Sequence, residues 1–155
     1  MKTLIQLLAV TLLLSLSVNL QAKDNDLKAL GESYFKAWQG SQMPDANKEA
    51  LENYLSFLTD DVGHQHLPYD PDATRESDGK ASMREGMTYY LGIHTEYKSE
   101  LTELITGHNV VIIKYTTSAK GIHPQTKQEV IIKDETIEVL EIEDGKVAVI
   151  RKYSD

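Results

Sequence analysis

The apolar residues of this chain change their spacing near residue 92. Before that point they recur every three or four positions, which is the spacing of one face of an α-helix. From Ser99 onward they alternate with polar residues in long runs rich in Ile, Val, Thr and Tyr, which predicts β-strands. The sequence therefore predicts helices first and strands afterwards, an order typical of the α+β class.

Three helices are predicted in the first part of the chain. The first begins at the short polar side chains of residues 24–26 and ends at Gly40. The second is capped by Asp45 and closes at the polar run 59–61, and the third is capped by Ser77 or Asp78 and runs through Gly92. Their inner faces, helix by helix, are predicted to carry Leu27, Leu30, Tyr34 and Trp38; Leu51, Tyr54, Leu55 and Leu58; and Met83, Met87, Tyr90 and Leu91.

A short strand and four long strands are predicted. They cover Val62 to Leu67, Ser99 to Thr106, Val110 to Ala119, Glu129 to Glu143 and Lys146 to Tyr153. Asp144-Gly145 is a strong signal for a tight hairpin between the last two strands. The segment from Pro68 to Ser77 contains two prolines and several charges and is predicted to be a loop.

The first residues carry the pattern of a secretory signal peptide. Lys2 precedes an apolar run, and Ala22 offers a small residue for cleavage. A transmembrane helix is the competing interpretation, but the run is short and contains Gln6 and two serines. We therefore expect residues 1–22 to be removed, residues 23–155 to form a single domain, and the mature protein to be periplasmic or secreted, with no membrane association.

The composition excludes several function classes. The formal net charge is −8 and no basic cluster is visible, so a nucleic-acid partner is not expected. The chain has no cysteine, which excludes disulfides and zinc sites built on thiolates.

Four segments carry a family resemblance. These are Tyr34 to Trp38, Phe57 to Val62, Gly79 to Glu85 and Glu141 to Val147. In this order and spacing they resemble the nuclear transport factor 2-like superfamily, and within it the SnoaL-like group, a superfamily that includes ketosteroid isomerase, scytalone dehydratase and polyketide cyclases. The resemblance implies a cone-shaped fold with three N-terminal helices packed on a curved, mostly antiparallel sheet around an internal pocket, often as a homodimer.

Three positions match places where ketosteroid isomerase keeps its catalytic groups. The resemblance implies Tyr34 as a hydrogen-bond donor to a substrate oxygen, His66 as the proton-transferring base and Glu138 as part of an oxyanion hole. The alternatives are structural: Tyr34 as a core residue and His66 as a hydrogen-bonded pocket wall. Glu138 is buried if Leu140 faces inward with it, and solvated if the neighbouring positions face inward instead.

His64 and His66 share one face of a strand, so they are also a possible metal pair. Asp70, Asp72 and His94 are candidates for a third ligand by residue type alone. Two histidines are a weak signal, and no metal or other cofactor is expected. His64, Trp38, Met87 and Tyr90 are instead predicted to line the pocket.

The sequence favours a protein that binds a small apolar or amphipathic molecule in its conical pocket. A cofactor-independent isomerase, cyclase or dehydratase that uses His66 to abstract a proton next to a carbonyl is the main alternative. A dimeric partner-binding module is the third. The loop from Pro68 to Ser77 is longer than in ketosteroid isomerase, and we expect it to contribute to specificity.

Overall fold

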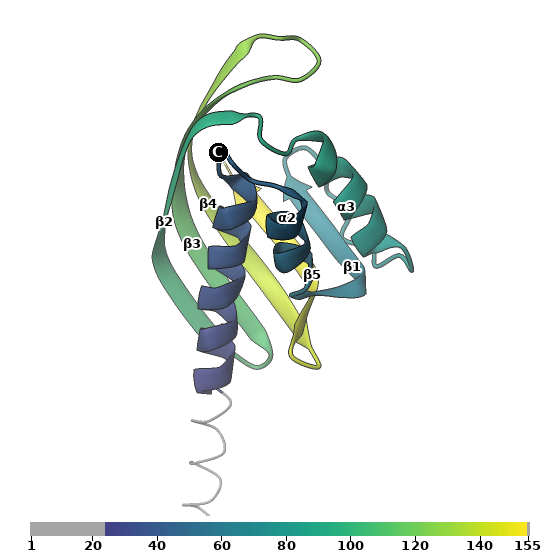
Figure 1. Ribbon diagram of the computed structural model, residues 1–155. Helices are drawn as coiled ribbons and strands as arrows, with labels where there is room; N and C mark the ends of the chain where they lie inside the picture. The colour runs from purple at the N-terminus through teal and green to yellow at the C-terminus, as the bar shows by residue number, and fades with distance from the viewer. Residues whose placement is uncertain (1–23, 155) are drawn as a thin grey trace, which may run out of the picture.

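The computed structural model describes residues 24–154, and the predicted signal peptide lies outside the described residues. One five-stranded sheet carries all the described helices on one of its faces (Figure 1). The helices cover residues 24–42, α2 Lys48–Leu55 and α3 Gly79–Tyr89, and the strands are β1 Leu58–Leu67, β2 His94–Gly107, β3 Val110–Ile122, β4 Glu129–Glu143 and β5 Lys146–Ser154. No helix within this part of the chain is both long enough and apolar enough to cross a membrane.

The sheet is mixed, with the strand order β1-β5-β4-β3-β2. β1 pairs in parallel with β5, and all other neighbours are antiparallel. The predicted hairpin at Asp144-Gly145 is present, and both residues have positive φ angles, 49° and 76°. Two consecutive positive φ angles match the right-handed twist of paired strands, which is why such turns favour Asn, Asp and Gly. The predicted α+β class is confirmed.

The first helix packs on the sheet through a stripe slightly different from the predicted one. Leu27, Tyr34 and Phe35 are buried, whereas Leu30 is only partly buried. Gly31 lies in the same stripe, where an added Cβ would fall 2.7 Å from a methyl carbon of Val111. The missing side chain therefore lets this helix lie close to β3.

The second helix is shorter than predicted, and the prediction of its N-cap residue was wrong. Asn47, not Asp45, is the N-cap, and its side-chain oxygen accepts a hydrogen bond from the Ala50 amide at 3.1 Å. The polar run 59–61 does not close this helix but lies inside β1. Strand pairing with β5 explains why the helix ends early, because Leu58 is paired with Val147 and is fully buried.

The third helix ends at Tyr89, before the predicted end at Gly92. Asp78 holds the N-cap position without a side-chain capping hydrogen bond. Met83 and Met87 pack against the core as predicted, while Tyr90 is 46% exposed.

The segment between β1 and α3 is irregular, as predicted, but it is attached to the sheet. Its Asp70 exchanges two backbone hydrogen bonds with His66, at 2.8 and 2.7 Å. Arg75 forms ion pairs with Asp61 at 2.8 Å and with Glu143 at 2.6 Å, which connect this segment to β1 and to the end of β4.

We expect Gly79→Ala to destabilise the protein, because the start of α3 lies directly against β1. An added Cβ would fall 2.3 Å from the carbonyl oxygen of Val62, a backbone atom that cannot rotate away. The expected loss in the free energy of unfolding is about 1–3 kcal/mol, measured by urea denaturation. Gly86→Ala in the same helix is the control, because no atom lies within 4 Å of its added Cβ. Equal stability of the two variants would contradict this close contact.

Candidate functional site

A cavity of about 440 Å³ lies between α3, the end of the first helix and β1. We call it the inner cavity. It is lined by Trp38, Ser41, Gln42, Tyr54, His64, His66, Met83, Gly86, Met87, Tyr90 and Lys152. This set includes the four residues predicted to line the pocket, His64, Trp38, Met87 and Tyr90, and it also includes His66. Methionine, tryptophan and tyrosine side chains dominate it, as expected for a site that binds an apolar molecule.

A second cavity, of about 220 Å³, adjoins the first and is called the side cavity. The two cavities share Trp38, Gln42, His66 and Lys152 in their walls. The remaining lining residues of the side cavity are more polar: Tyr69, His94, Tyr97, Tyr115, Thr117, Ile132, Asp134, Thr136 and Ser154. An apolar compartment therefore lies beside a polar one, with His66 and Lys152 at the boundary.

The two histidines of β1 point to the same side of the strand, with ring centres 6.3 Å apart. His66 Nε2 lies 2.9 Å from Ser154 Oγ, and its ring packs edge-on against Tyr69. Desolvation lowers the pKa of His64 and of His66, and the nearby charge of Lys152 lowers both further. Both imidazoles are therefore mainly uncharged at pH 7.

Tyr34 and Glu138, the other two candidate catalytic residues, are brought together behind the cavity wall. Tyr34 donates a hydrogen bond to Glu138 Oε2 at 3.1 Å, and Tyr115 donates one to Glu138 Oε1 at 2.7 Å. Glu138 is only 3% exposed and Tyr34 is fully buried, so the structure shows the buried alternative for both residues. Neither lines the inner or the side cavity, and the predicted catalytic role of all three candidates stays a prediction.

The direction of these hydrogen bonds decides whether the tyrosine hydroxyls present a hydrogen-bond donor or an acceptor to the cavities. A tyrosine hydroxyl carries one proton, and that of Tyr34 is directed at Glu138. The Tyr54 hydroxyl lies 3.1 Å from that of Tyr34 and must therefore be the donor in this pair. Tyr54 and Tyr115, which line the cavities, thus direct their protons away from them and offer oxygen lone pairs instead.

Burial raises the pKa of Tyr34, Tyr54 and Tyr115 well above the ordinary value for tyrosine, and the nearby charge of Glu138 raises each further. All three hydroxyls therefore stay protonated at pH values at which an exposed tyrosine would ionise. The group formed by Glu138 and these three tyrosines is called the Tyr–Glu network below.

Sequence reasoning missed several residues that the fold brings to the site. Tyr69 comes from the irregular segment after β1, and Asp134 and Lys152 come from β4 and β5. The one available signal was alternation, because Asp134 and Thr136 share a strand face with Glu138. The parallel pairing of β1 with β5, which places Lys152 beside His66, could not be read from the sequence.

Within residues 24–154, no three His, Asp or Glu side chains are arranged to hold a metal ion. His94, a candidate third ligand, lies at the start of β2, where its Nδ1 is 2.7 Å from the carbonyl oxygen of Gln42. Asp72 accepts hydrogen bonds from Thr74 within the segment after β1.

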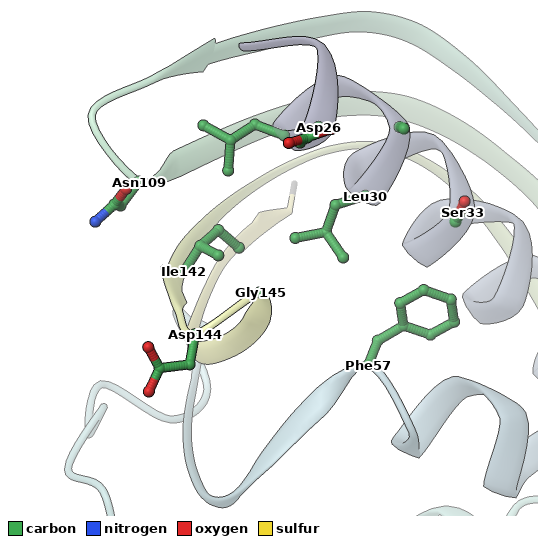
Figure 2. Close-up of a pocket in the computed structure, with 10 residues that line it drawn as sticks. Asp26, Leu30, Ser33, Phe57, Asn109, Ile142, Asp144 and Gly145 are labelled. Carbon is green, nitrogen blue, oxygen red and sulfur yellow. The ribbon is translucent and has the colours of Figure 1, made fainter. Parts of the chain in front are cut away.

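A separate hollow of about 680 Å³ lies at the other end of the first helix (Figure 2). Leu30, Phe57 and Ile142 surround it, and the side chains of Asp144 and Asn109 point away from it. None of the sequence-predicted site residues lines this hollow. Because ionisable groups converge on the inner and side cavities, those two are the better candidate site.

Comparison with protein-family models gave no match. No curated protein matched the sequence either.

Solved structures do match. A provisionally named SnoaL-like polyketide cyclase from Shewanella denitrificans aligns over 83% of this chain and 90% of its own, with a TM-score of 0.65 and 10% identity. A provisionally named ketosteroid isomerase from Kribbella flavida aligns over 85% and 79%, with a TM-score of 0.60 and 16% identity. A nuclear transport factor 2-like protein of unknown function from Exiguobacterium aligns over 81% and 98%, with a TM-score of 0.60 and 9% identity. At these identities the likeness shows the fold alone, and it confirms the cone-shaped fold that the sequence resemblance implied.

We expect Tyr115→Phe to lower stability at pH 7 and to change its dependence on pH. Loss of the hydrogen bond to Glu138 costs about 1–3 kcal/mol in the free energy of unfolding. Above pH ~10 the unfolded chain releases tyrosine protons that the folded Tyr–Glu network retains, so stability falls by about 1.4 kcal/mol per pH unit for each such tyrosine. The variant lacks one of these protons and should show a shallower fall.

Urea denaturation at several pH values between neutral and strongly alkaline measures both effects. Tyr153→Phe is the matched control, because Tyr153 is 41% exposed and lines neither cavity. If the free energy of unfolding falls equally steeply with pH in the two variants above pH ~10, the Tyr–Glu network does not retain the Tyr115 proton.

Proposed function

We propose that this chain uses its nuclear transport factor 2-like fold to bind a small amphipathic molecule in the inner cavity. The observation that carries the proposal is the division of the site. Trp38, Met83 and Met87 provide an apolar wall, and His66 and Lys152 stand at the entrance to the polar side cavity. A ligand with an apolar body and one polar group matches this division.

The fold comparisons support a small molecule as the ligand class. Two of the similar structures are provisionally named a SnoaL-like polyketide cyclase and a ketosteroid isomerase, names that refer to polyketides and ketosteroids. Binding is favoured over catalysis because the Tyr34 proton is directed at Glu138 and Tyr34 has no exposed surface.

Export and dimer formation stay predictions that accompany this proposal. Ile105, Ile137 and Tyr153 are exposed on strands of the sheet and would support a dimer packed through it. Multi-angle light scattering measures the mass in solution, and the intact mass of the exported chain shows whether residues 1–22 are removed.

We expect the neutral dye N-phenyl-1-naphthylamine to bind in the inner cavity and to accept energy from Trp38. Trp38 is the single tryptophan of the sequence and lines this cavity, so its fluorescence reports on the site. Met87→Trp fills the cavity and should weaken dye binding at least about tenfold, because the displaced apolar contacts contribute more than 1.4 kcal/mol.

Met43→Trp is the matched control, because Met43 is partly exposed and lines neither cavity. Dye fluorescence excited directly is compared for both variants, after thermal denaturation has verified that each is folded. Equal dye affinity in the two variants would show that the dye binds outside the inner cavity. Native mass spectrometry of freshly purified protein then identifies a natural ligand that stays bound.

Proton abstraction next to a carbonyl, with His66 as the base, is a second candidate function. The supporting observation is that His66 lines both cavities and has a lowered pKa, so it is available as an uncharged base at pH 7. We expect the protein to accelerate deuterium exchange at the α-carbon of 2-tetralone, measured by NMR, and His66→Ala to lose this acceleration.

His108→Asn is the control for this experiment, since His108 is exposed in the β2–β3 turn with a φ angle of 49°, which asparagine tolerates. Exchange that is no faster than in buffer, or that survives in His66→Ala, would remove the base assignment while leaving ligand binding intact.

A further inference from the structure

Among residues 24–154, Lys152 is the lysine that lines both the inner and the side cavity. It lies on β5, where its register partners are His66 on β1 and Glu138 on β4. Its ammonium nitrogen is 5.2 Å from the centre of the Trp38 ring. The ammonium group therefore lies at the boundary between the apolar and the polar compartment.

Within residues 24–154, no carboxylate forms an ion pair with Lys152. The ion pairs in this part of the chain use other cations: Arg75, Lys80, Arg84, Lys114, Lys120 and Arg151. Glu138, the strand neighbour of Lys152, already accepts hydrogen bonds from Tyr34 and Tyr115. Within the described part of the chain, the charge of Lys152 thus faces the cavities without forming an ion pair.

Acidic groups are distributed unevenly around this lysine. No aspartate or glutamate of residues 24–154 lines the inner cavity. Asp134 lines the side cavity, but it forms no ion pair with Lys152. Among the described residues, Lys152 is therefore the charged side chain of the inner-cavity wall.

The neighbouring histidines add neutral hydrogen-bonding groups to this charge. Burial and the Lys152 charge lower the pKa of both rings, so that at pH 7 His64 and His66 carry one N–H donor each. A ligand oxygen near Lys152 could accept from the ammonium group and from an imidazole at the same time.

We propose that Lys152 binds the carboxylate of an amphipathic acid whose apolar body occupies the inner cavity. This inference rests on the proposed function and specifies its ligand class. A charge inside a concave, mostly apolar wall interacts more strongly with an opposite charge than it would in open water. The contact with Trp38 offsets only part of the desolvation of the ammonium group, and a bound carboxylate would offset more.

The test compares three ligands that share one chain and differ in the head group: octanoate, 1-octanol and octylammonium. By isothermal titration calorimetry at pH 7, we expect the wild-type protein to bind octanoate at least roughly tenfold more tightly than 1-octanol, and octylammonium most weakly. Lys152→Met keeps an apolar stem against Trp38 and should bind octanoate no better than 1-octanol. Lys152→Arg keeps the charge and should retain the preference.

Lys133→Met removes an exposed lysine of β4 that lines neither cavity, and it should behave as wild type. Equal binding of octanoate and 1-octanol by the wild type, a preference for octylammonium, or an unchanged preference in Lys152→Met would overturn the carboxylate inference and leave the proposed function in place. If none of the three ligands binds, both proposals fail. Thermal denaturation verifies folding, and Lys152→Arg provides the comparison if Lys152→Met does not fold.

Discussion

The buried carboxyl group of Glu138 is the constraint on which the rest of this structure depends. A carboxyl group taken out of water without hydrogen-bond donors costs several kcal/mol, so its partners must be held in place. Those partners come from different layers: Tyr34 from the first helix and Tyr115 from β3, with Tyr54 of α2 donating in turn to Tyr34. The Tyr–Glu network therefore fixes both helices against the sheet, and the inner cavity takes its shape from that arrangement.

The same network separates structural polar groups from those that a ligand can reach. Because the tyrosine protons are directed toward Glu138, the cavity receives few donors from the core. Its polar side chains are instead those of His64 and His66 on β1, Lys152 on β5, and Ser41 and Gln42 at the end of the first helix. The proposed function therefore relies on recognition of a ligand by charge and hydrogen bonding at one edge of an apolar cavity.

The segment after β1 completes this edge from outside the sheet. Hydrogen bonds between Asp70 and His66 and the ion pairs of Arg75 hold it against β1. Tyr69 then packs on the His66 ring and lines the side cavity. The expectation that this segment contributes to specificity thereby gains a physical basis, since it positions one wall of the compartment into which the polar part of a ligand would extend.

The sequence by itself determined the α+β class, the existence of each described helix and strand, and the Asp144-Gly145 hairpin, because periodicity and turn chemistry are local properties. It also indicated His64, Trp38, Met87 and Tyr90 as wall residues, from their places on predicted faces. Only the tertiary structure decided that Glu138 is buried, since alternation leaves both faces of a strand open until the packing of the sheet is known. It alone placed Lys152 beside His66, because the parallel pairing of β1 with β5 joins segments more than 80 positions apart, for which no local signal exists.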